Sequence, residues 1–225
     1  MSQKKDPFMP RLLGQDWQRP LGKIVCVGRN YAEHAAELNN PVPAQPLLFM
    51  KPATAAVQLG KTLQLPGDRG PVHYETELAL LIGKPLSKAT PDEVLPAIAG
   101  VGLALDLTLR ELQSQLKQKG HPWELAKAWD GACPLTDFVP ARQVENWPDL
   151  ELSLAINGEE RQRGKANQML TPIPELLSYI SQHFTLLPGD LVITGTPSGV
   201  GELASGDQLE LQLTGLLTSK TRIAE

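Results

Sequence analysis

Residues 72–83 read VHYETELALLIG, and this stretch combines two close acidic charges with a long apolar run. Glu75 and Glu77 stand two residues apart, which in a strand places both side chains, with that of His73, on one face. The apolar run that follows predicts a strand whose second half is buried on both faces. Because like charges in a buried site repel each other, the two glutamates predict a cation between them.

Outward from this strand, other apolar runs bounded by glycine and proline predict further strands. These strands are expected over 23–28, 46–52, 61–68, 101–109, 150–158, 191–195 and 208–215. The dipeptide Asn157-Gly158 predicts a hairpin that returns through residues 159–165. Helices are expected over 31–38, 90–100, 110–120 and 171–184. Strands outnumber helices and do not alternate with them regularly, so the pattern predicts an α+β fold.

The composition is that of an ordinary globular protein, and the length suits one large domain or two small ones, with nothing in the composition that forces a split. Of 225 residues, 41% are apolar and 20% charged, and the net charge of −4 offers no footprint for nucleic acid or an anionic membrane. Residues 1–22 are expected to form a leader packed on a single domain over 23–225. The leader lacks the apolar segment of a signal peptide, and Cys26 and Cys133 suggest no disulfide framework. A cytoplasmic location is therefore expected.

A third carboxylate lies in the strand expected over 101–109. Asp106 interrupts the apolar sequence GLALDLTL, and a lone buried aspartate is costly unless it is paired or bound to a cation. Glu75, Glu77 and Asp106 together would make a hard, all-oxygen site suited to Mg²⁺, Mn²⁺ or Ca²⁺. The alternative is a solvated strand face, with Asp106 capping the helix that follows.

Three further features are candidates for chemistry. His34 and Glu37 lie three residues apart on an expected helix, where a carboxylate could orient the imidazole as a general base, although such pairs are also common on exposed helices. Lys127 is flanked by apolar and aromatic residues, which fits either a buried ammonium or an ordinary snorkelling lysine. The loop TGTPSGVG (194–201) matches no phosphate-binding or nucleophile motif. Its glycines either let the backbone approach a small ligand closely or form a tight structural turn.

The order of these motifs resembles the fumarylacetoacetate hydrolase superfamily, and most of all its short acylpyruvate hydrolase branch. The resemblance runs from about Lys23 onward and rests on VCVGRNYAEH, FMKP, HYETELALLIGK, GLALDLTLRELQ, PWELAKAWDGACPL, INGEERQRG and PGDLVITGTPSGVG. It implies a mixed β-roll with peripheral helices, a homodimer, and Mg²⁺ or Mn²⁺ held by the three carboxylates. Asp137 departs from the family pattern, in which glycine is frequent at this place.

The resemblance also assigns roles to residues. It implies catalytic roles for His34 and Glu37 on a lid helix and for Lys127. It implies that substrate contacts are made by Arg29, Arg110, Gln113, Gly195 and Thr196.

The implied activity is metal-dependent hydrolysis of a carbon–carbon bond in 3-acylpyruvates, such as fumarylpyruvate or acetylpyruvate, to pyruvate and a carboxylic acid. The same metal–enolate site could instead decarboxylate oxaloacetate or tautomerise a 2-oxo acid, and single residues do not separate these reactions. A non-catalytic binder of dicarboxylates would need the carboxylates and Arg29 but not the pair of His34 and Glu37. A zinc hydrolase is disfavoured because the four histidines form no ligand set.

Overall fold

A computed structural model describes residues 6–37 and 41–225, and its larger sheet contains the strand that carries Glu77 and begins directly after Glu75. The strand order is β4 (Leu47–Lys51), β3 (Ile24–Gly28), β14 (Leu191–Ile193), β7 (Thr76–Ile82), β8 (Ile98–Leu105), β10 (Cys133–Leu135) and β5 (Ala56–Gln58), with β11 (Val139–Pro140) paired to β8. β3 runs parallel to β14 and β10 runs parallel to β5, whereas β7 is antiparallel to both of its neighbours. The sheet is therefore mixed.

Smaller sheets flank this one. One has the order β13 (Glu159–Lys165), β12 (Glu151–Ile156), β16 (Gln208–Leu213) and β17 (Leu217–Arg222). Another has the order β15 (Gly201–Glu202), β6 (Val72–Tyr74) and β9 (Thr108–Leu109), and β1 (Arg11–Leu12) pairs with β2 (Gln15–Asp16).

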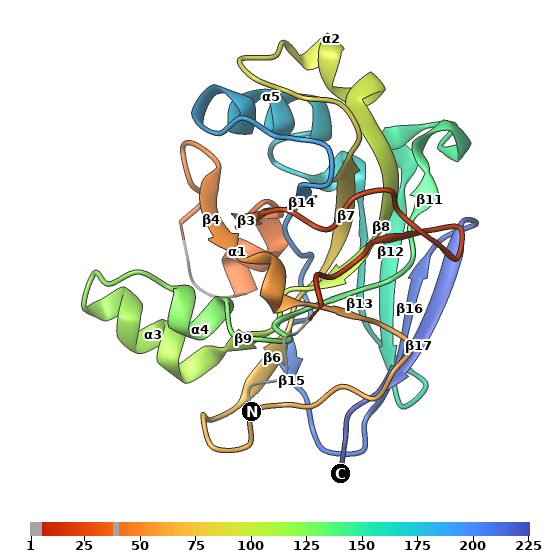
Figure 1. Ribbon diagram of the computed structural model, residues 1–225. Coiled ribbons are helices and arrows are strands. Elements are labelled where there is room, and N and C mark those ends of the chain that lie inside the picture. Colours follow the sequence, from red (N-terminus) through yellow and green to blue (C-terminus); the bar gives the residue numbers. More distant parts are fainter. Residues whose placement is uncertain (1–5, 38–40) are drawn as a thin grey trace.

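Helices lie at the periphery of the sheets (Figure 1). They are α1 (Ala32–Glu37), α2 (Pro91–Val94), α3 (Arg110–Gln118), α4 (Glu124–Lys127) and α5 (Ile173–His183), with short 3-10 turns at Ala53–Ala55, Leu95–Ala97, Ala141–Gln143, Trp147–Asp149 and Ala166–Gln168. α2 and α5 pack together at one end, and α3 and α4 lie beside each other on another side (Figure 1). The predicted α+β fold, a curled mixed sheet with peripheral helices, is confirmed.

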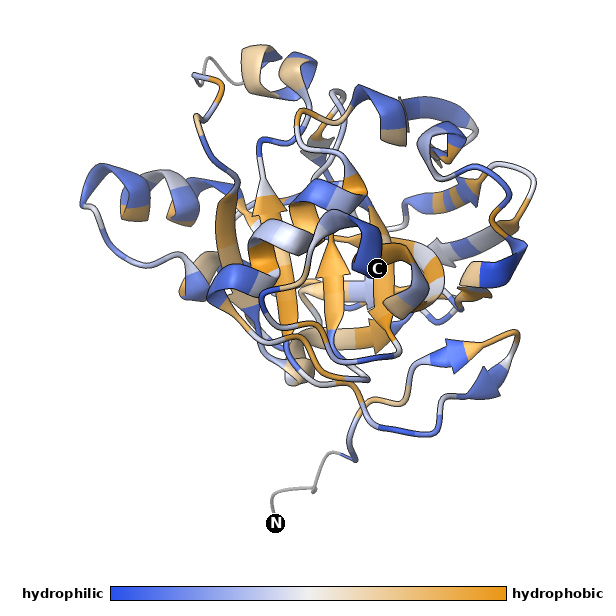
Figure 2. Ribbon diagram, turned by 90° about the horizontal axis from the view of Figure 1, so that it is seen from above, coloured by the Kyte–Doolittle hydropathy of each residue, from blue (hydrophilic) through white to orange (hydrophobic). Residues whose placement is uncertain are grey.

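β7 is buried on both faces, as its apolar sequence predicts. Leu78, Leu80 and Ile82 join a core with apolar residues of α5, β12 and β16, whereas Ala79 and Leu81 belong to a second core. The alternation follows from the two-residue period of a strand. Figure 2 shows the resulting apolar strands at the centre of the molecule. Two packed faces hold β7 rigidly, and with it the glutamate that it carries.

The second core is covered by the N-terminal segment. Phe8, Leu12 and Trp17 pack against it, and the N–H of Leu13 donates to the carbonyl of Phe138 at 3.0 Å. Residues 1–5 of the expected leader lie outside the described residues, and the division into a leader and a domain over 23–225 stays a prediction. Within the described part of the chain, no helix has the length and apolar character needed to span a bilayer.

Several predicted elements differ from the observed ones. The segment 61–68 makes only an isolated bridge, between Leu63 and Ile223, because Pro66 and Gly67 prevent a longer ladder. The strand expected over 101–109 begins earlier and is broken at Asp106, where the chain passes from β8 to β9. The helix expected over 31–38 is α1, and its last predicted residue, Leu38, lies outside the described residues.

Candidate metal centre

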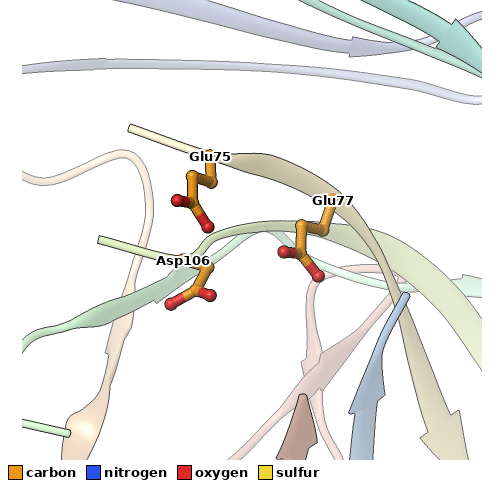
Figure 3. Close-up of side chains that lie close together, drawn as sticks. All are labelled: Glu75, Glu77 and Asp106. Carbon is orange, nitrogen blue, oxygen red and sulfur yellow. The ribbon is translucent and has the colours of Figure 1, made fainter. Parts of the chain in front are cut away.

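The three predicted carboxylates meet where strands pass from the larger sheet to the three-stranded one. Glu75 lies between β6 and β7, and Asp106 lies between β8 and β9. The N–H of Asp106 donates to the carbonyl of Glu75 at 2.8 Å. This bond joins the connection between β6 and β7 to the connection between β8 and β9. Glu77 stays within β7, opposite Ala104 of β8. The three carboxylates converge from these two strand pairs (Figure 3).

Their arrangement fits a divalent cation. One oxygen from each of Glu75, Glu77 and Asp106 lies within 4.8 Å of the other two, and all three side chains are buried. Asp106 Oδ1 accepts no hydrogen bond within the described residues, although the ammonium of Lys51 lies 2.7 Å from it. Burial contradicts the alternative of a solvated strand face. Three carboxylate oxygens suit Mg²⁺ or Mn²⁺.

The charge of Glu77 supports this interpretation. Burial raises the pKa of Glu77 well above its usual range, and the neighbouring charges of Asp106 and Glu75 raise it further. The N–H of Gly195 donates to Glu77 Oε2 at 2.7 Å and offsets only part of this effect. A divalent cation between the carboxylates would favour the ionised form of Glu77.

Lys127 lies against two of the three carboxylates. Its Nζ donates to Glu75 Oε2 at 2.8 Å and to Asp106 Oδ2 at 2.6 Å. Burial alone would lower the pKa of Lys127, but Asp106 and Glu75 outweigh burial and raise it. Burial likewise acts to raise the pKa of Glu75, yet the Lys127 ammonium holds that pKa well below its usual range. Lys127 is therefore a buried, charged ammonium and not a snorkelling lysine.

A second buried ammonium, that of Lys51 at the end of β4, was missed by the sequence analysis. Its Nζ lies 2.7 Å from Asp106 Oδ1 and also donates to the carbonyls of Lys127 and, at 3.0 Å, Ala132. Asp106 is thus held between two lysines. The motif FMKP contains Lys51, but a lysine before a proline at a strand end is typical of an exposed position, so the sequence offered no clear signal.

The predicted pair on α1 is formed, and it is connected to the glycine-rich loop. His34 Nδ1 lies 3.3 Å from Glu37 Oε2, and Glu37 Oε1 accepts a hydrogen bond from the N–H of Gly199 at 3.0 Å. Ser198 Oγ donates to Glu33 Oε2 at 3.3 Å. His34 is buried, which contradicts an exposed surface pair. With Nδ1 donating to Glu37, the imidazole keeps Nε2 as its proton acceptor.

A buried amide orders the other end of the glycine-rich loop. Gln162 of β13 accepts from the N–H of Thr76 at 2.9 Å through Oε1, which fixes Nε2 as the side that donates to Thr196 Oγ1 at 2.8 Å and to the carbonyl of Pro197 at 3.0 Å. Because Thr196 Oγ1 accepts this bond, its hydroxyl proton stays available to the cavity. Gln162 was also missed, since it lies in the charged run EERQRGK.

Replacement of Gln162 tests this contact. Gln162→Met leaves the buried N–H of Thr76 without its acceptor, so the free energy of unfolding should fall by about 1–3 kcal/mol. Urea denaturation followed by circular dichroism measures this change. Gln118→Met, at an exposed position of α3, is the matched control and should stay near the wild-type value. Equal stability of the two variants would contradict a structural role for Gln162.

The remaining predicted residues surround one cavity beside the carboxylates. Arg110 Nη1 donates to Gln113 Oε1 at 3.1 Å and lies 3.5 Å from Glu75 Oε1. Arg29 enters this cavity from a left-handed backbone position, with a φ of 58°. The cavity is lined by Val27, Gly28, Arg29, His34, Leu47, Phe49, Glu75, Glu77, Arg110, Gln113, Lys117, Trp123, Lys127 and Thr196. Phe49, Lys117 and Trp123 were not predicted.

The comparison with known protein families agrees with this geometry. The model of the fumarylacetoacetate (FAA) hydrolase C-terminal family matches residues 23–224. The chain belongs to this family. This FAA hydrolase family member is 51% identical over 197 residues to oxaloacetate tautomerase YcgM of Escherichia coli, covering 87% of the chain and 90% of that relative. It is 38% identical over 214 residues to the human mitochondrial oxaloacetate tautomerase FAHD1, covering 95% and 96% of the two chains.

A similar solved structure contains a metal ion. Fumarylpyruvate hydrolase from Pseudomonas aeruginosa, crystallised in complex with Mn²⁺ and pyruvate, superposes with a TM-score of 0.92 at 36% identity. The match covers 98% of this FAA hydrolase family member and 97% of that chain. The protein is therefore an enzyme of a metal-dependent family. The individual roles of the site residues, and the homodimer, stay predictions.

Proposed function

We propose that the enzyme is a metal-dependent oxaloacetate tautomerase, which interconverts the enol and keto forms of oxaloacetate. The observation that carries the proposal is the placement of His34, Glu75, Glu77 and Lys127 around one cavity. Asp106 converges on the two glutamates and Glu37 bonds to His34, so both act from behind this lining. The names of the similar E. coli and human proteins support the choice of substrate. Hydrolysis of 3-acylpyruvates, the first expectation from the sequence, becomes the second candidate.

Glu75, Glu77 and Asp106 would hold the cation, which when bound supplies a Lewis acid that polarises the keto oxygen of a 2-oxo acid. Lys127 adds a fixed positive charge beside the same carboxylates. In tautomerisation a C3–H bond breaks, its electron pair forms the C2–C3 double bond, and negative charge gathers on the C2 oxygen. A buried ammonium stabilises such charge strongly because little water screens it.

The proton must be carried between carbon and oxygen. We assign this task to His34, whose free Nε2 can accept a proton from C3 and return it. Glu37 holds the imidazole by Nδ1 and stabilises the imidazolium that forms. The bond from Gly199 to Glu37 ties this helix to the glycine-rich loop, so α1 and the loop would close over the substrate together.

The second candidate is C–C hydrolysis, because a histidine oriented by a glutamate can also activate water. The similar P. aeruginosa protein is a fumarylpyruvate hydrolase, which gives this candidate independent support. Decarboxylation of oxaloacetate would use the same enolate without water attack. A non-catalytic binder of dicarboxylates is disfavoured, since the chain belongs to a family of enzymes.

Parallel assays separate the candidates. The purified enzyme with Mg²⁺ would be given enol-oxaloacetate and acetylpyruvate, with enol decay, pyruvate release and CO₂ release measured in each case. We expect kcat/KM for enol decay of oxaloacetate to exceed that for pyruvate release from acetylpyruvate by at least about tenfold, a difference of about 1.4 kcal/mol in activation free energy. The reverse order would overturn the proposal in favour of acylpyruvate hydrolysis.

Substitution of Glu37 tests the role of the pair. Glu37→Gln keeps an acceptor for the N–H of Gly199 but cannot stabilise an imidazolium at His34, so kcat should fall by about 10²-fold. Glu33→Gln is the matched control, because the Glu33 side chain also bonds the glycine-rich loop, through Ser198, but forms no ion pair with the His34 ring among the described residues. An equal effect of both substitutions on kcat would show that α1 acts only through its contacts with the loop.

A further inference from the structure

One cation of the cavity has no role in the chemistry described so far. Lys117 lies on α3, seven residues after Arg110 and four after Gln113, so the three side chains share one face of the helix. All three line the cavity that contains the carboxylates. The face of α3 that holds the predicted substrate contacts therefore extends by one more helical turn, to Lys117.

Lys117 is held in place without a counter-charge. Its Nζ lies 5.2 Å from the centroid of the Trp123 ring, and no carboxylate pairs with it among the described residues. Partial burial, together with the charges of Arg110 and Arg29, lowers the pKa of Lys117 to about 8, against the opposing effect of the more distant Glu75 carboxylate. In the free enzyme this ammonium is thus unfavourably placed, and a bound anion would relieve the repulsion.

The cavity therefore has two different ends. At one end, carboxylates and Lys127 are arranged for a cation and the 2-oxo acid group. At the other end is Lys117, and two rings link the ends: Lys127 Nζ lies 5.1 Å from the centroid of the Phe49 ring, the Phe49 and Trp123 centroids lie 5.9 Å apart, and Lys117 Nζ lies 5.2 Å from the Trp123 centroid. A substrate with an uncharged distal group would leave a desolvated ammonium without a partner, which disfavours it. A distal carboxylate would instead gain a charge-assisted hydrogen bond.

We propose that Lys117, whose ammonium lies over the Trp123 ring, binds the distal carboxylate of the substrate. Lys117 would thereby select 2-oxo dicarboxylates over 2-oxo monocarboxylates. This inference rests on the proposed function, because it names the part of oxaloacetate that distinguishes it from simple acylpyruvates. Lys117 acts here as a specificity residue and takes no part in proton transfer. The contact with Trp123 fixes the direction of the ammonium and limits the entropy lost on binding.

Unreactive analogues test the inference without turnover. Isothermal titration of the wild-type enzyme with Mg²⁺ present would compare L-malate, which has the distal carboxylate, with L-lactate, which lacks it. Lys117→Gln should raise the Kd of malate by about tenfold or more and leave that of lactate within about twofold. Lys117→Arg should recover most of the affinity for malate. Lys119→Gln, at the exposed C-cap just after α3, controls for the general loss of a positive charge at constant salt.

The outcomes are separable from those of the activity assays. A Lys117→Gln enzyme that binds malate as tightly as the wild type would overturn the inference. An equal loss of affinity for malate and for lactate would also overturn it. Either result would leave the tautomerase proposal standing, because neither ligand reacts. A selective loss of affinity for malate would support the inference even if the enzyme prefers a 2-oxo dicarboxylate other than oxaloacetate. A thermal melt of each variant verifies that it is folded.

Discussion

Glu77→Gln is expected to remove metal binding while leaving the fold intact, and to lower kcat by about 10³-fold. Glutamine has the shape of a protonated glutamate, and the surroundings of Glu77 already raise its pKa well above the usual range. Its amide oxygen can still accept the N–H of Gly195. The metal-free variant should therefore melt at or above the temperature of the metal-free wild type, since a repelling charge has been removed.

Thermal melts with and without Mg²⁺ measure the metal contribution directly. The wild-type enzyme should be stabilised by the ion because ligands that bind only the folded state raise its stability. Glu77→Gln should lose this shift, whereas Glu145→Gln, an exposed control, should keep it. A full Mg²⁺ shift in Glu77→Gln would contradict the assignment of Glu77 as a ligand.

Lys127→Met is expected to separate metal binding from catalysis. The substitution keeps an unbranched side chain as far as Cε but removes the ammonium from Glu75 and Asp106, so both carboxylates stay available to the ion. Mg²⁺ should still stabilise the variant. Turnover of oxaloacetate should nevertheless fall by about 10²–10³-fold, because a buried charge that stabilises the enolate has been lost.

The control for this prediction is Lys119→Met, which removes an exposed lysine at the C-cap of α3 and should not change kcat. Steady-state assays at saturating Mg²⁺ give kcat and KM for each variant. Undiminished kcat in Lys127→Met would remove Lys127 from the mechanism. If Mg²⁺ no longer raised the melting temperature of Lys127→Met, Lys127 would act by organising the carboxylates for metal binding.

The carboxylate site could be predicted from sequence because few alternatives explain its pattern. Glu75 and Glu77 precede an apolar run and Asp106 interrupts another, so burial and charge conflict at three named positions. Lys51 could not be found in the same way, because its partner Asp106 lies 55 residues further along the chain. Its charge is balanced only by tertiary structure, which a local pattern does not contain.

The same distinction applies to the other missed residues. Gln162 lies in a strongly charged strand whose remaining side chains are largely exposed, and only the pairing of β13 with β12 turns it inward. Lys117 lies on the cavity-facing side of α3, which the spacing from Arg110 could have indicated. It was overlooked because a lysine near the end of a helix has an ordinary explanation in the helix dipole.

The strand predictions succeeded where side chains decide the structure and failed where the backbone does. The continuous apolar run of β7 and the apolar alternation of β12 reflect their burial, and the hairpin at Asn157-Gly158 follows from its turn chemistry. The break at Asp106 has no such local cause. It arises because the chain leaves β8 to pair with β6, and this change of partner places the carboxylate in the metal site.

Metal-dependent tautomerisation of oxaloacetate is the central claim, and the decay of enol absorbance tests it most directly. The wild-type enzyme would be mixed with enol-oxaloacetate in the presence of Mg²⁺ and, separately, of excess EDTA, with Glu77→Gln as a parallel sample. We predict decay well above the spontaneous rate with Mg²⁺, and the spontaneous rate in EDTA and in the variant. Decay at the spontaneous rate in all three samples, or acceleration that survives EDTA, would contradict the account.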